Sequence, residues 1–239
     1  MANLARYTRP LYDLDTVVVF DDFVNDQADT VFVDTITDSG TVLMGDDVNG
    51  VATLTPSDGS VVDNDETYLT HPNEIFRFGT NRCIYGRCKL RYTEVSANVA
   101  NVAFFFMNAA VANSIIDDGA GLKVTGSTLG IYKVDGGTVW RCVSSCNGTS
   151  TVTASVMTAA AATDYVLEIE CLDWDGTSMK VVFKVDGEYL KDSNGYVIRH
   201  TVAIASSTEM MVGVGIKLGA STNNDTLLVD YVYAHQTRV

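Results

Sequence analysis

Two glutamates on one expected strand come nearest, in this chain, to a pair that could do hydrolytic chemistry. Glu168 and Glu170 alternate with apolar residues between Tyr165 and Cys171, so both carboxylates are expected on the same face of a strand. Two carboxylates on one face can act as nucleophile and acid in glycoside hydrolysis. The run from Glu168 to Asp173 lacks the E-x-D-x-x-E order of such a strand, and the pair fits an exposed strand face equally well. We therefore assign no catalytic residue.

Short acidic runs are the candidates for calcium ligands, because hard carboxylate oxygens close in sequence suit Ca²⁺. None of them has the twelve-residue loop pattern with its fixed glycine and bidentate glutamate. We interpret them as solvated turn acids and expect no metal and no cofactor. The runs are Asp21-Asp22, Asp46-Asp47, Asp63-Asn64-Asp65-Glu66 and Asp117-Asp118.

The five cysteines do not form a convincing metal or disulfide framework. Cys83 and Cys88 are spaced C-x4-C, and Cys142 and Cys146 are spaced C-x3-C, whereas zinc sites usually have C-x2-C. The odd count also argues against complete disulfide pairing. We expect reduced or half-buried thiols in a protein assembled in a cytosol.

Aromatic side chains could stack on sugar rings, and the two tryptophans differ in this respect. Trp140 lies in the alternating run Thr138–Val143 and is expected in the core. Trp174 lies in the acidic sequence Asp173-Trp174-Asp175-Gly176, which predicts a turn. Trp174 is therefore the candidate glycan contact.

The charge balance excludes some classes of partner. The chain has 30 acidic and 16 basic side chains, a formal net charge of −14. A field of this sign repels phosphate backbones and anionic lipids, so we expect no nucleic-acid and no membrane partner. No apolar run approaches the roughly 20 residues that span a bilayer, and residues 1–10 do not resemble a signal peptide.

The pattern along the chain predicts strands throughout. Asp135-Gly136-Gly137 joins two strand-like runs as a hairpin turn, and Asp186-Gly187 is a second turn of this kind. About a dozen short strands at close spacing indicate a sandwich or barrel. We expect an all-β fold, a two-sheet antiparallel β-sandwich, with an extended N-terminal arm over residues 1–16 and a single domain over residues 17–239.

Three segments resemble the concanavalin A-like (laminin G-like) jelly roll. The run Val181 to Glu188 has the form V-x-F-x-V-D-G-E, and Leu227 to Val232 resembles the closing strand of such domains with V-D-Y-V. The F-D-D-F sequence at Phe20 to Phe23 resembles their entry. The resemblance implies a jelly-roll sandwich, and the fold hosts lectins, glycanases, adhesion modules and viral proteins alike.

A second resemblance concerns the whole composition. The Met-Ala-Asn start, the acidic Ser/Thr/Gly-rich chain and the closing V-D-Y-V-Y-A-H-Q-T-R resemble structural proteins of tailed bacteriophages. This implies a non-enzymatic virion component, most simply a capsid decoration protein. In this hypothesis the arm docks on the major capsid protein or other virion subunits, and the protein is a homo-oligomer, which we expect to be a trimer. The docking residues would be Arg6, Tyr7, Arg9, Leu11 and Tyr12.

The alternative is a carbohydrate-binding, lectin-like module, with or without calcium. It assigns the binding contact to Trp174. A divergent glycanase that uses Glu168 and Glu170 is a third hypothesis.

Overall fold

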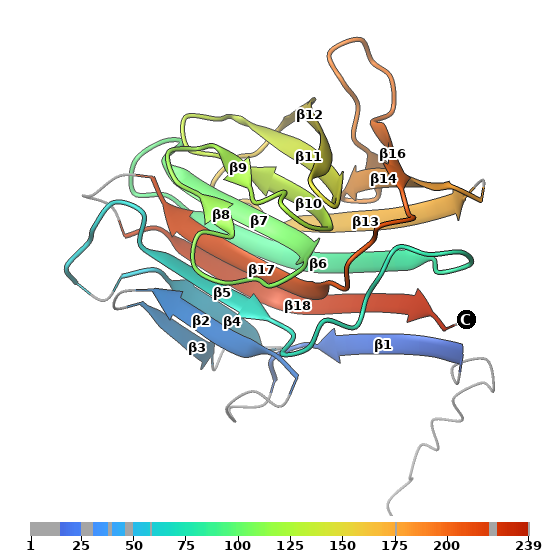
Figure 1. Cartoon of the computed structure of the whole chain (residues 1–239). Coiled ribbons are helices and arrows are strands. Elements are labelled where there is room, and N and C mark those ends of the chain that lie inside the picture. The colour runs from blue at the N-terminus through green and yellow to red at the C-terminus, as the bar shows by residue number, and fades with distance from the viewer. Residues whose placement is uncertain are drawn as a thin grey trace, which may run out of the picture.

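The computed structural model describes residues 15–24, 31–37, 40–45, 50–57, 59–174, 176–219 and 224–238. In this part of the chain all regular structure longer than a single turn is strand, and two large antiparallel sheets stack face to face (Figure 1). The expected all-β, two-sheet sandwich is confirmed. No helix in the described residues is long and apolar enough to cross a membrane.

Each sheet has a continuous antiparallel order. The seven-stranded sheet runs β12 (Thr149–Thr158), β11 (Val139–Cys146), β10 (Thr128–Lys133), β7 (Ala100–Met107), β17 (Met211–Leu218), β5 (Glu66–Thr70) and β2 (Val33–Thr37). The other sheet runs β15 (Glu188–Tyr189), β14 (Ser178–Val185), β13 (Tyr165–Trp174), β6 (Ile84–Thr93), β18 (Thr226–Thr237), β4 (Val51–Thr55) and β3 (Thr41–Gly45). Two more strands complete this nine-stranded sheet: β1 (Thr16–Asp21) pairs with β18, and β16 (Arg199–Ala203) pairs with β14.

The core fills the space between the sheets because the inward-facing positions of the long strands in both sheets are apolar. In β13, Leu167 and Ile169 point inward and are fully buried. Phe104 and Phe106 of β7 meet them from the opposite sheet, and Trp140 is also fully buried, as predicted. Burial of this continuous apolar cluster is the main force that holds the sheets together.

A second apolar cluster lies on the outer face of the seven-stranded sheet. Residues 108–127, here called the strap, cross this face and include the short pair β8 (Ile115–Ile116) and β9 (Gly121–Leu122). Ile115 and Leu122 of the strap bury themselves against Phe105, Tyr132 and their neighbours. The strap therefore closes the outer face of this sheet (Figure 1).

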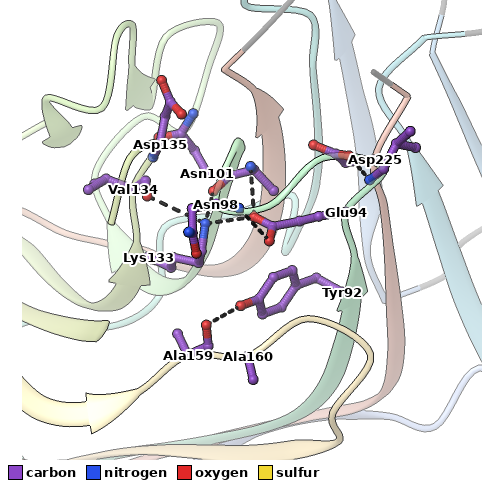
Figure 2. A network of polar contacts seen from close by, with 12 residues as sticks. Tyr92, Glu94, Asn98, Asn101, Lys133, Val134, Asp135, Ala159, Ala160 and Asp225 are labelled. Carbon is purple, nitrogen blue, oxygen red and sulfur yellow. Dashed lines mark hydrogen bonds and ion pairs between the residues drawn. The ribbon is translucent and has the colours of Figure 1, made fainter. Parts of the chain in front are cut away.

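A buried ion pair holds the loops at one end of the sandwich. The Lys133 ammonium donates to Glu94 Oε1 at 2.7 Å and to the Ala100 carbonyl at 2.9 Å (Figure 2). The other Glu94 oxygen accepts from the Asn98 amide at 3.0 Å. Nearby, Asp225 accepts from the Val95 amide at 2.8 Å. Because its charges are satisfied by one another and by the backbone, this network fixes residues 94–101 against β10.

The structure corrects several sequence predictions. Residues 75–78, Ile-Phe-Arg-Phe, have the alternating pattern that predicts a strand, but only an isolated bridge joins Phe76 to Met210. The acidic run over residues 57–66 is typical of a loop, and the strand β5 that begins at its end was not predicted. Glu66-Thr-Tyr-Leu-Thr is largely polar, yet it is buried on both faces. Asp65 and Glu66 are 0% and 1% exposed, so the interpretation of these two as solvated turn acids is wrong.

Candidate functional site

The residues singled out from the sequence fall in different places. The five expected docking residues at positions 6, 7, 9, 11 and 12 lie outside the described residues. Trp174 is the last residue of β13, paired through its backbone with Met179, and not part of a turn. Glu168 and Glu170 alternate on β13 with core residues, so they point to the outer face of the nine-stranded sheet.

On that outer face two cross-strand rows of side chains run perpendicular to the strands. We call them together the outer ladder. Pairing between neighbouring strands is in register, and five strand spacings make the rows about 24 Å long. The first row is Phe20, Tyr233, Arg87, Glu168, Lys184 and Tyr189. The second row is Val18, His235, Tyr85, Glu170, Val182 and Arg199.

One end of the outer ladder is aromatic. The Tyr233 ring lies 6.4 Å from the Phe20 ring and 6.1 Å from the Tyr85 ring, centroid to centroid. His235 packs at 5.4 Å from Tyr85. Phe20 is 52% exposed on the edge strand β1, so this aromatic end is open to a ligand. Such rings offer flat apolar surface together with hydroxyl groups that can hydrogen-bond.

The centre of the outer ladder is charged. The Tyr85 hydroxyl donates to Glu168 Oε2 at 2.8 Å, and Arg87 Nε lies 3.9 Å from Glu168 Oε1. Lys184 donates to Glu170 Oε2 at 2.8 Å and lies 4.7 Å from the centre of the Tyr189 ring. Each carboxylate is thus balanced by a neighbouring cation or hydroxyl.

Burial and neighbouring charges shift the titration of these groups. Burial, followed by the hydrogen bond to Glu168, raises the pKa of Tyr85 well above its ordinary value. The hydrogen bond to Glu170 raises the pKa of Lys184. Burial lowers the pKa of His235, which favours its neutral form. At neutral pH the outer ladder therefore presents neutral hydroxyls and rings beside fixed charges.

Two open cavities flank the outer ladder along β6. One of about 380 Å³ is lined by Tyr85, Glu170 and His235 of the second row, together with Cys83 and Leu172. The second, of about 340 Å³, lies beyond the first row and is lined by residues that include Lys89, Arg91, Asp164, Leu228 and Asp230. Both are large enough for one or two sugar rings.

The outer face of the seven-stranded sheet is a poorer candidate because the strap covers its polar groups. Glu66, Tyr68 and Lys217 are buried there, with the Lys217 ammonium 3.2 Å from Glu66 and the Tyr68 hydroxyl 2.5 Å from Glu66. Strap residues complete their hydrogen bonds: the Asn113 amide donates to Glu66 and the Ile115 amide to Tyr68. Burial, followed by the Glu66 charge, raises the pKa of Tyr68. These groups stabilise the strap and do not face a ligand.

The acidic runs do not gather into a metal centre within the described residues. No group of three or more histidine, cysteine, aspartate or glutamate side chains there is arranged to hold an ion. Asp21 accepts from the Phe23 amide and Asp65 from the Val62 amide, as turn residues do. Asp46-Asp47 lies outside the described part of the chain. The cysteines are free thiols, and four of the five are buried.

No protein-family model and no curated protein sequence matches this chain. Solved structures do match it. An endo-1,3-beta-glucanase from Streptomyces sioyaensis superimposes with a TM-score of 0.57 at 17% sequence identity, over 97% of this chain and 100% of that chain. Arcelin-5, a lectin-like defense protein from Phaseolus vulgaris, does so with a TM-score of 0.57 at 8% identity, over 94% and 100%. Lectin II from Ulex europaeus gives 0.53 at 13% identity, over 92% and 98%.

The chain has the concanavalin A-like fold. At such low identity the likeness shows the fold and carries no residue of a site across. It confirms the jelly-roll architecture that Val181 to Glu188 and the closing strand implied. The outer ladder was missed by sequence analysis, although one signal was present. Outward positions of β6, read at every second residue, are Tyr85, Arg87, Lys89 and Arg91.

Proposed function

We propose that this protein is a carbohydrate-binding module of the concanavalin A-like fold and that the outer ladder is its binding surface. The observation that carries the proposal is the pair of in-register rows, aromatic at one end and charged in the centre, with an open cavity on either side. Aromatic faces stack on sugar rings, and carboxylate, guanidinium and hydroxyl groups bind sugar hydroxyls.

The folds of known proteins support the same class of function. Two of the three structures named above are a lectin and a lectin-like protein, and the third is a glucanase. The proposal is binding without hydrolysis, because the Glu168 carboxylate accepts a hydrogen bond from the Tyr85 hydroxyl and the Glu170 carboxylate accepts one from the Lys184 ammonium. The proposal assigns more glycan contacts than the sequence hypothesis, because it adds the ladder residues to Trp174. Trp174 lies at the end of β13, the strand that carries both glutamates.

A glycan array with the purified protein tests the proposal, followed by titration calorimetry on the best binder. We expect Phe20→Ala and Tyr233→Ala to weaken binding at least about tenfold, which corresponds to about 1.4 kcal/mol. The matched control is Tyr196→Ala, because Tyr196 is 73% exposed in the segment before β16, outside the ladder. Trp174→Ala belongs in the same series.

Two outcomes would overturn the proposal. One is a folded protein that binds no glycan on the array. The other is glycan binding that Phe20→Ala and Tyr233→Ala leave unchanged, which would move the site to another surface. Near-ultraviolet circular dichroism of each variant separates a lost contact from a lost fold.

The virion hypothesis remains a prediction. It depends on the arm over residues 1–16, and its five docking residues lie outside the described residues. A carbohydrate-binding module on a virion would satisfy both hypotheses, because attachment to a surface glycan needs only the ladder. Association with the major capsid protein and a trimeric state stay proposals that particle-binding experiments can test.

A further inference from the structure

Basic residues gather on the face that carries the outer ladder. Of the 16 lysine and arginine residues in the chain, six are at outward positions of β6, β14 and β16. Strand alternation settles this orientation, because the intervening residues of each strand are buried in the core. The six are Arg87, Lys89, Arg91, Lys180, Lys184 and Arg199.

Acidic partners compensate half of these cations. Glu168 pairs with Arg87, Glu170 with Lys184, and Asp230 with Lys89 at 2.6 Å. Three others, Arg91, Lys180 and Arg199, are exposed, and none of them forms an ion pair within the described residues.

The sign of this local charge is opposite to that of the whole chain. The outward strand positions carry six cations and three acids, whereas the chain has a net charge of −14. One further acid, Asp164, lines the cavity beside Arg91. Exposed cations without an acidic partner make the local potential more positive, and this favours a ligand that brings negative charge.

The arrangement of the cations suits an extended ligand with separated charges. Arg87, Lys89 and Arg91 follow one another at every second residue of β6, about 7 Å apart. Arg199 ends the second row on the far side of Glu170. Arginine binds carboxylate in a bidentate manner, so a carboxylated sugar could use the guanidinium groups while its ring lies on an aromatic face.

We infer that the outer ladder binds carboxylated polysaccharides, that is, chains rich in uronic acids. The inference rests on the proposed function and names the class of glycan. A polyuronate carries at most one charge per sugar, whereas duplex DNA carries one charge per about 1.7 Å of axis. The repulsion from the net negative protein is therefore smaller for the polysaccharide, which can also use the rings of Tyr233 and Phe20.

The test uses pairs of polymers that differ only in charge. Polygalacturonate, alginate and hyaluronate are each compared with their methyl-esterified forms, by affinity electrophoresis and calorimetry on the full-length protein. We expect the charged form of at least one pair to bind about tenfold tighter and to lose this preference in 0.5 M NaCl, where screening is strong. The double variant Arg91→Gln/Arg199→Gln should lose the preference as well. The control Lys191→Gln, at an exposed lysine that is not one of the six cations of this face, should keep it.

Each other outcome is decisive. Equal binding of charged and esterified forms, or binding of neutral glycans alone, overturns the inference and leaves the carbohydrate-binding proposal in place. Absence of binding to any glycan overturns both. If a DNA duplex of equal total charge binds as tightly and responds to the same double variant, the face is a general anion-binding surface and the polysaccharide assignment is wrong.

Discussion

The Tyr85 hydroxyl donates a 2.8 Å hydrogen bond to the carboxylate of Glu168 across the β6–β13 pair. The two residues belong to neighbouring rows of the outer ladder, since Tyr85 is opposite Glu170 and Arg87 is opposite Glu168. The bond therefore ties the aromatic end of one row to the charged centre of the other. It also holds Glu168 in a fixed orientation beside Arg87, which gives the face a defined pattern of donors and acceptors.

Replacing Tyr85 with phenylalanine should show what this bond contributes. Tyr85→Phe keeps the ring and its packing but removes a hydrogen bond to a charged acceptor, so we expect a loss of about 1–2 kcal/mol in the free energy of unfolding. Urea denaturation of the two proteins measures it. Tyr189→Phe is the control, because Tyr189 is exposed at the end of the first row. Equal stability of Tyr85→Phe and the wild type would show that water replaces the hydroxyl without cost.

The buried pair of Lys133 and Glu94 should be far more sensitive to single substitutions. The side chains are 0% and 4% exposed, so Lys133→Met leaves the Glu94 carboxylate buried without its main partner (Figure 2). We expect a destabilisation of about 3–5 kcal/mol, measured by chemical denaturation. The double variant Lys133→Met/Glu94→Gln should recover part of this loss, because the uncompensated charge is then absent. A single variant with wild-type stability would mean that the carboxylate accepts a proton or reaches water.

A glycine on β17 should be needed for the packing beneath the strap. A Cβ atom at Gly215 would lie 2.3 Å from the Tyr68 ring, which hydrogen bonds to Glu66 and Ile115 hold in place. Gly215→Ala should therefore cost about 1–3 kcal/mol through overpacking. The melting temperature measures the effect, and Gly187→Ala is no suitable control because its φ of +81° adds strain. Val152→Ala, at an exposed position, should leave the melting temperature nearly unchanged.

Sequence analysis predicted well those strands in which apolar and polar residues alternate strictly. β13 was located because Leu167 and Ile169 alternate with Glu168 and Glu170, and such a period has one structural meaning. β5 was missed because Glu66 and Lys217 are buried charges that satisfy each other across strands, and pairing over 151 residues leaves no local signal.

The candidate site could not be assembled from the sequence for a related reason. The first row of the outer ladder joins Phe20, Tyr233 and Arg87 from three strands that are far apart in the chain. Alternation indicates that each side chain points outward, but strand order and register decide which of them become neighbours. Conversely, Trp174 looked like a turn residue because Asp173 and Gly176 flank it, whereas sheet pairing with Met179 extends β13 through it.

Acid should destabilise the protein through the buried His200. Its Nδ1 lies 2.9 Å from Ser144 Oγ and its Nε2 lies 3.0 Å from Thr153 Oγ1, and burial lowers its pKa to about 4. The folded state therefore binds this proton less readily than the unfolded state, in which the pKa is near 6.5. The stability that the neutral ring contributes is complete above pH 6.5 and is lost as the pH falls toward 4, by up to about 3 kcal/mol.

Urea denaturation at pH 7.5, 5.5 and 4.5 measures this loss. His200→Gln keeps hydrogen-bonding atoms near Ser144 and Thr153 but cannot take up the proton, so its stability should depend less on pH over this range. A parallel decline in both proteins would assign the acid sensitivity to carboxylates such as those of the ion pairs instead.

Deletion of residues 1–14 should separate the arm from the fold. β1 begins at Thr16 and pairs with β18 from Thr16 to Asp21, so this deletion leaves every described strand intact. If the arm clasps neighbouring subunits through Tyr7, Leu11 and Tyr12, light scattering coupled to size exclusion should show an oligomer for the full chain and a smaller species for the truncated one. Serine replacements at these three positions should reproduce the effect, since apolar anchors contribute most of such binding. A monomer in all three cases would remove arm-driven self-association.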